Sequence, residues 1–211
     1  MIIKSLSDQV YEYIFRKIRI GDLKDGDKIE ENSLIDELGI SRTPIREALI
    51  QLTSDHLLEN RPRKGYYVKL SNSKEISELW DIISVLDSHA IELAIVNDSI
   101  DNEKIEHLTN CLSEIDNAIT CRDYESYYKW QEEFHMTYLS NCGNEVLEKE
   151  MKMLLKRTLR MTYYSQDKDI LFDILKKSNA QHKQILEAIK NHDAKKAKSI
   201  VMEHWGCTLE E

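Results

Sequence analysis

The sequence predicts a mainly α-helical protein, in which a small N-terminal domain with a β-hairpin precedes an all-helical bundle. Proline and glycine indicate this division, because both prolines and four of the six glycines lie before residue 70. The following 141 residues contain no proline and are rich in Leu, Ile, Glu and Lys, a composition typical of helices joined by short connections. Apolar residues also recur there at helical spacing. We therefore expect two domains, over residues 1–70 and 74–211, with the boundary near Ser71.

The first domain is predicted to contain three helices and a β-hairpin. The expected elements are helices over residues 5–20, about 31–38 and from 41 onward, followed by strands over 57–60 and 66–70. Gly39 suits the end of the second helix, and Ser41 is a favourable N-cap for the third, which has Pro44 in its first turn. A Lys64-Gly65 tip joins the two strands. This order of elements predicts a winged helix-turn-helix.

The second domain is predicted to be an antiparallel bundle of about six helices. Amphipathic segments lie at residues 74–97, 103–120, about 123–140, 145–164, 169–190 and 194–208. The fifth segment has a candidate break near Ser178-Asn179. Amphipathic helices joined by short links bury their apolar stripes against one another in such a bundle.

Charge is distributed unevenly between the two domains. Lys and Arg balance Asp and Glu over residues 1–70, so the later residues supply the whole net charge of -9. Within residues 40–69, six basic side chains outnumber three acidic ones. A confined basic segment on an otherwise acidic chain indicates contact with a polyanion, although a solvated surface explains the charge alone equally well.

The sequence is not expected to belong to a membrane protein or a secreted protein. No run of 18 or more apolar residues is present, and acidic side chains lie where a signal peptide would be apolar. The four cysteines form no CxxC pair, which fits a reducing compartment and argues against a thiolate zinc site. We therefore expect a cytoplasmic protein without a membrane segment.

The segment GISRTPIREALIQL, residues 39–52, is the most informative stretch. The first turn of the predicted third helix presents Arg42, Thr43 and Arg46. Recognition helices contact DNA through their N-terminal residues, and arginine can bind guanine in a bidentate manner. Helix N-termini and hydroxyl groups, such as that of Ser41, suit phosphate oxygens. The alternative is a surface helix with two incidental arginines.

Three of the seven histidines lie in helical segments whose apolar stripes indicate the interior of the bundle. They are His135, His182 and His204, and Gln131 lies one turn before the first of them. Three imidazoles converging inside a bundle would suit a divalent transition metal. From spacing alone, ordinary hydrogen-bonded or surface histidines are the more frequent explanation.

Residues 5–70 resemble the DNA-binding domain of the GntR family of bacterial transcription regulators. The resemblance is carried by the string SRTPIREAL and by LLENRPRKGYYV after it. It implies that the recognition-helix arginines meet DNA, that nearby hydroxyls meet phosphates and that the wing glycine enters the minor groove. The positions assigned to DNA contact are Ser41, Arg42, Thr43, Arg46, Lys64 and Gly65. Two positions depart from the family pattern: Asp25 replaces a common proline, and His56 stands where glycine is usual.

Residues from about 74 to 208 resemble the helical effector domain called FCD, of the FadR subfamily of the same regulators. The segments FHMTYLSNCGN, QHKQILEAIKNHDAKKA and MEHW reproduce its layout. The resemblance implies a divalent metal, with zinc, nickel or manganese as candidates. The ligands that it implies are His135, His182 and His204.

This second resemblance also has two departures. Gln131 occupies the position of the usual aspartate ligand, and a neutral amide is the poorer ligand for a transition metal. Ile83 replaces an arginine that often faces the effector in relatives. Recognition of a carboxylate must then come from elsewhere or be absent. Arg157 and Arg160 are weak candidates for that role.

These features predict a homodimeric transcription regulator and no enzyme. Two winged domains would read an inverted repeat in double-stranded DNA. The bundle would mediate dimerisation and bind a small metabolite, often an organic acid in relatives, in a metal-assisted pocket. We expect the protein to repress transcription and the metabolite to relieve that repression. One alternative is an effector pocket without metal. Another is a metal-dependent hydrolase with a DNA-binding module. Against it, the sequence has no carboxylate base at a suitable spacing from the histidines and no nucleophile motif.

Overall fold

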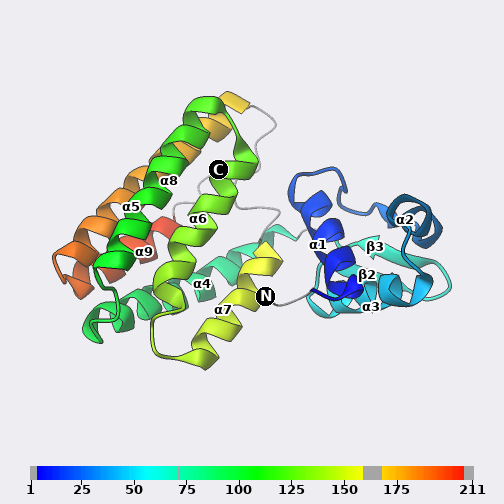
Figure 1. Ribbon diagram of the computed structural model, residues 1–211, viewed down its shortest axis with the longest axis horizontal. Helices are drawn as coiled ribbons and strands as arrows, with labels where there is room; N and C mark the ends of the chain where they lie inside the picture. Colours follow the sequence, from blue (N-terminus) through cyan, green and yellow to red (C-terminus); the bar gives the residue numbers. More distant parts are fainter. Residues whose placement is uncertain (1–3, 71, 159–167, 207–211) are drawn as a thin grey trace. The chain divides into compact units, whose positions relative to one another are not determined.

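The computed structural model describes residues 4–70, 72–158 and 168–206. The chain divides into two compact units, which are described separately (Figure 1). The first unit also includes the start of α4, up to Glu75, and the end of α7 from Lys156. By chain order, we call residues 4–70 the N-terminal unit and the helices that follow them, α4 to α9, the helical bundle. No helix within these ranges is long and apolar enough to cross a membrane.

The N-terminal unit contains three helices and three short strands among its described residues. They are α1 (Leu6–Arg19), β1 (Lys28–Ile29), α2 (Glu31–Leu38), α3 (Arg42–Ser54), β2 (Leu58–Arg61) and β3 (Gly65–Val68). Helix α1 begins at a capping box, in which Ser5 and Asp8 each accept a hydrogen bond from the other's backbone N–H. It packs on α3, where Ile45 and Leu49 have no exposed surface. The three helices lie where the sequence predicts them.

The strands form one antiparallel sheet in the order β1-β3-β2. Strands β2 and β3 make the predicted hairpin, with Glu59 opposite Tyr67. Strand β1 pairs with the other edge of β3, so that Lys28 also lies opposite Tyr67. The sequence did not predict β1, because a two-residue strand produces no periodic pattern.

Two connections of this unit use backbone conformations with positive φ. Gly39 ends α2 at φ 65°, a left-handed conformation that glycine adopts without steric cost, and this produces the turn before α3. His56 has φ 61° between α3 and β2. Any side chain is disfavoured in that conformation, which accounts for the glycine expected at this position in the family that the sequence resembles.

The helical bundle contains the six helices that the sequence predicts. They are α4 (Ser73–Val96), α5 (Asn102–Cys121), α6 (Tyr124–Leu139), α7 (Glu145–Thr158), α8 (Lys168–Lys190) and α9 (Ala194–Gly206). The predicted helical ends at residues 159–164 and 207–208 lie outside the described residues.

The break expected near Ser178-Asn179 is wrong, because α8 is continuous there. Both polar side chains have tertiary partners instead. The Tyr127 hydroxyl donates to Ser178 at 3.0 Å, and the Asn179 amide donates to Asp116 at 2.7 Å. Since neighbouring helices supply these bonds, the polar pair does not interrupt the helix.

The bundle core brings distant segments of the chain together. Helix α5 packs against α6 and α8, and α9 packs against α8; Figure 1 shows α5 and α8 running side by side. Trp80 of α4 stacks on Trp205 of α9, with ring centroids 5.0 Å apart and planes inclined by 22°. This packing places inward-facing side chains of α6, α8 and α9 next to one another.

Candidate functional site

The N-terminus of α3 is exposed and carries the residues predicted to contact DNA. Arg42, Thr43 and Arg46 are exposed, whereas Ile45 on the opposite face is fully buried. Ser41 holds the N-cap position, but its hydroxyl is exposed and makes no capping hydrogen bond. The sequence therefore located the helix start correctly, but the Ser41 hydroxyl does not cap the helix.

Side chains of α2 hold both arginines of α3. Arg46 donates from Nε to Glu31 at 2.8 Å, and Arg42 donates from a terminal nitrogen to Asn32 at 2.8 Å. The Arg46 side chain is 55% exposed in this ion pair. Because the bond to Glu31 uses Nε, the terminal nitrogens of Arg46 are the ones suited to a bidentate contact with a base edge.

The turn between β2 and β3 is a tight basic tip. The Lys64 backbone N–H donates to the Arg61 carbonyl at 2.9 Å, and both Arg63 and Lys64 are exposed. Gly65 follows at φ 96°, a backbone conformation in which a residue with a side chain would be strained. Arg61 lies over the Tyr67 ring, 4.1 Å from its centroid. The predicted tip is thus a narrow, positively charged turn.

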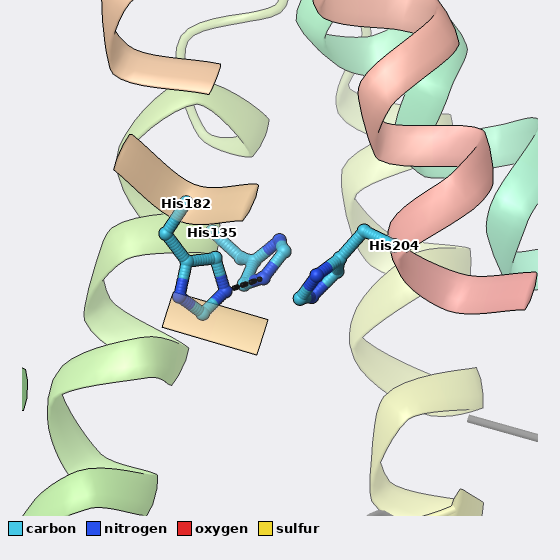
Figure 2. Close-up of side chains that lie close together, drawn as sticks. All are labelled: His135, His182 and His204. Carbon is cyan, nitrogen blue, oxygen red and sulfur yellow. Dashed lines mark hydrogen bonds between the residues drawn. The ribbon is translucent and has the colours of Figure 1, made fainter. Parts of the chain in front are cut away.

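Three buried histidines converge inside the helical bundle (Figure 2). They are His135 of α6, His182 of α8 and His204 of α9. One nitrogen of each ring lies within 4.8 Å of those of the other two. His135 Nε2 and His182 Nε2 are 3.1 Å apart. The three rings therefore bring nitrogen atoms close together, as the resemblance to the FCD domain implies.

Partners outside the trio orient two of the rings. His135 Nδ1 lies 3.1 Å from Asp87 Oδ2, and His204 Nδ1 lies 3.1 Å from Gln181 Oε1. A glutamine carbonyl oxygen accepts hydrogen bonds, so the His204 ring carries its proton on Nδ1. The opposite nitrogen, His204 Nε2, is buried and has no hydrogen-bond partner among the described residues. A buried lone pair of this kind fits a bound cation.

The electrostatics of the trio favour the neutral form of two rings, His182 and His204. Burial lowers the pKa of both His182 and His204 well below the usual histidine value, and the charge that a neighbouring protonated histidine would carry lowers these pKa values further. Neutral imidazole is the form that binds metals. Zinc and other borderline transition metals prefer imidazole nitrogen, so the residues present fit such an ion.

The other predicted positions in the bundle have varied surroundings. Gln131 is buried, one turn before His135 on α6. Ile83 is fully buried as a packing residue. Arg157 donates to Glu75 at 3.0 Å, which commits part of its guanidinium to an ion pair, and Arg160 lies outside the described residues.

Comparison with known proteins identifies both parts of the chain. Residues 6–68 match the family described as bacterial regulatory proteins, gntR family, and residues 78–206 match the FCD domain. This chain is a GntR-family regulator with an FCD domain. Members of this family regulate transcription through a DNA-binding helix-turn-helix and are not enzymes.

Several relatives align with this FCD regulator over nearly their whole length. The HTH-type transcriptional regulator YdhC of Bacillus subtilis is 28% identical, over 93% of this chain and 86% of the relative. The HTH-type transcriptional repressor GlaR of Escherichia coli is 23% identical, over 92% of this chain and 90% of the relative. The solved structure of E. coli McbR/YncC has the same fold, with a TM-score of 0.83, 22% identity and coverage of 97% and 95% of the two chains.

Several residues that support the predicted ones in this regulator could not be predicted from the sequence. Glu31 and Asn32 of α2 hold the two arginines, and no local pattern marks them as partners of α3. Asp87 is more conspicuous in retrospect, because it is an acid on the apolar stripe of α4, four residues after Ile83 and four before Ile91. An ionisable residue in such a stripe is a signal for a buried polar partner.

Proposed function

We propose that this regulator is a cytoplasmic homodimer that represses transcription until a small metabolite binds in a metal-assisted pocket of its FCD domain. The domains are those predicted from the sequence, residues 1–70 for DNA binding and 74–211 for effector binding and dimerisation. One observation carries the proposal: the same chain has exposed arginines at the N-terminus of α3 and a buried cluster of three histidines. Repression rather than activation is supported by GlaR, a relative described as a repressor.

In this proposal, the N-terminus of α3 reads one half of an inverted repeat. Arg42 and Arg46 contact base edges in the major groove, and the hydroxyls of Ser41 and Thr43 bind phosphates. Lys64 and Gly65 place the wing tip against the adjacent minor groove, where a lysine meets the stronger negative potential. Two copies are required, since one recognition helix covers only a few base pairs.

The homodimer draws support from an exposed apolar face on α4. Ile82, Val85 and Val96 are 49%, 55% and 68% exposed and lie on one side of the helix. A second copy of the chain is the occupant we propose, because the DNA model needs a two-fold partner. Replacing Ile82 and Val85 together with Glu should yield a monomer in size-exclusion chromatography with light scattering. Ile170→Glu, an equally exposed site on α8, should leave the dimer intact, and a dimer in both variants would exclude this face.

The metal that we propose is held by His135, His182 and His204. Zinc and nickel suit three imidazoles better than manganese, which prefers oxygen ligands, and Gln131 in place of an aspartate strengthens that preference. When bound, such an ion offers open positions to the oxygen atoms of a small carboxylate. Neutral polar groups close to the histidines, such as Ser178 and Asn179 one turn before His182, complete the effector pocket in this proposal.

An effector pocket without metal is the second candidate for the bundle. It is favoured by the amide at position 131 and by the short contact of 3.1 Å between the His135 and His182 rings, which a shared proton also explains. Elemental analysis of the purified protein after dialysis separates the two: about one metal per chain supports the metal site, and none supports the alternative.

Selection from random duplexes tests the DNA-binding part of the proposal. The full-length protein should enrich an inverted repeat, and binding to that operator should fall steeply with added salt because phosphate contacts release counterions. A salt-independent affinity would contradict phosphate contacts. A thermal-shift screen of small carboxylates and sugar acids, with and without zinc, then tests the effector. Stabilisation that requires both partners supports a metal-assisted pocket.

A further inference from the structure

A buried aspartate lies behind the histidine trio. Asp87 of α4 is 1% exposed, and a single carboxylate oxygen, Oδ2, has three close nitrogen or oxygen neighbours from two other helices. Trp205 Nε1 donates to it at 2.7 Å, the Tyr138 hydroxyl donates at 2.7 Å, and His135 Nδ1 lies at 3.1 Å. Asp87 therefore joins α4 to α6 and α9 next to His135.

These contacts determine which nitrogen of His135 carries the proton. An indole N–H only donates, and the tyrosine hydroxyl, having donated to Asp87, presents its oxygen to His135 Nδ1 at 2.5 Å. His135 Nδ1 thus faces two acceptor oxygens, those of Asp87 and Tyr138. A bare nitrogen there would meet lone pairs on both sides, whereas an Nδ1–H satisfies both.

The proton on Nδ1 leaves a lone pair on the opposite nitrogen. That nitrogen, His135 Nε2, is the one that lies 3.1 Å from His182 Nε2 in the centre of the trio (Figure 2). A carboxylate that accepts from the distal N–H of an imidazole fixes the ring and raises the basicity of the nitrogen that binds the metal. The geometry of Asp87 matches this arrangement, and its oxygen atoms are not among the converging ligand atoms themselves.

We propose that Asp87 is a positioning residue, which holds His135 as its Nδ1–H tautomer and thereby sets the metal affinity of the trio. This inference rests on the proposed metal site. Tyr138 and Trp205 complete the arrangement by keeping the Asp87 carboxylate in place. Asp87 thus adds to the FCD site a component from α4, the helix that follows the wing in the chain.

The test compares Asp87→Asn with Asp81→Asn in the full-length protein. Both variants replace one carboxylate of α4 with an amide, but Asp81 is exposed, so only the first changes the acceptor that faces His135. Zinc affinity, measured by competition with a chromophoric chelator, should fall about 10–100-fold in Asp87→Asn. In Asp81→Asn it should stay close to the wild-type value. Equal affinities in the two variants would overturn the proposal.

A second readout does not require the variants to fold. Long-range nitrogen–proton NMR of the histidine-labelled, metal-free wild-type protein reports the tautomer of each ring. The proposal requires the proton of His135 on Nδ1, and a proton on Nε2 would contradict it. Absence of zinc binding by the wild-type protein would instead remove the proposed metal site, while the tautomer would still decide the role of Asp87.

Discussion

The two functional regions of this regulator are built in opposite ways. The first turn of α3 places Arg42 and Arg46 on the surface within five residues of the chain, each held by one polar side chain of α2. The histidine centre draws on α6, α8 and α9, with its residues separated by up to 69 positions in the chain, and each of the three residues is at most 3% exposed. The contrast suits their proposed ligands, since a polyanion binds at an exposed cationic surface and a transition metal binds at a buried cluster of imidazoles.

The largest expected effect is the loss of bound metal when histidine side chains of the centre are removed. Replacing His182 and His204 together with Ala removes two of the three proposed ligands, so stoichiometric metal should disappear from the purified protein. Elemental analysis after dialysis measures this directly. His192→Ala, which removes an exposed histidine, is the matched control and should retain the metal. The same metal content in wild type and double variant would refute the ligand assignment.

Truncating an arginine side chain at the N-terminus of α3 should lower the affinity for DNA. Arg46→Ala should weaken binding to the selected operator by about 1–3 kcal/mol, since one bidentate base contact is lost. Fluorescence anisotropy with a labelled operator gives this value. Lys176→Ala on α8 also removes one positive charge and should bind as wild type. If Arg46→Ala were as tight a binder as that control, Arg46 would lie outside the interface.

Burial of the histidines predicts an acid-sensitive bundle. In the folded protein the pKa values of His182 and His204 lie well below about 6.5, the value in an unfolded chain. As the pH falls below 6.5, the unfolded chain takes up protons that the folded chain refuses, so the metal-free protein should lose stability by up to about 1.4 kcal/mol per pH unit for each ring. Urea unfolding between pH 7.5 and 5.5 should show this slope, and the double alanine variant should show a shallower one.

The smallest effect is expected at the strained connection after α3. His56 has φ 61°, so His56→Gly should relieve about 1 kcal/mol of steric cost, offset in part by the larger entropy of glycine in the unfolded chain. The thermal midpoint should therefore rise slightly, with operator affinity unchanged. Gly39→Ala, which introduces a side chain at φ 65°, should lower the midpoint. A lower midpoint in His56→Gly would show that the His56 side chain makes a compensating contact.

The same contrast explains how much could be predicted from the sequence. Helical periodicity located the helices that the described residues form, and SRTPIREAL marked the exposed turn of α3, because these features are local in the chain. The three candidate histidine ligands were predicted through a family pattern, since spacing alone could not bring residues 135, 182 and 204 together. Tertiary partners were missed: Asp87 and Glu31 depend on which helices pack, and Ser178-Asn179 does not break α8 because other helices satisfy it.

A base-by-base scan of the operator most directly tests whether α3 reads sequence. Each base pair of one half-site is changed in turn, and the wild-type protein and Arg46→Ala are titrated against every duplex at one salt concentration. We predict that Arg46→Ala loses discrimination at one base pair, while the preference at the other positions of the half-site is retained. Uniform weakening at every position, or an unchanged pattern of preferences, would contradict direct reading of a base by this arginine.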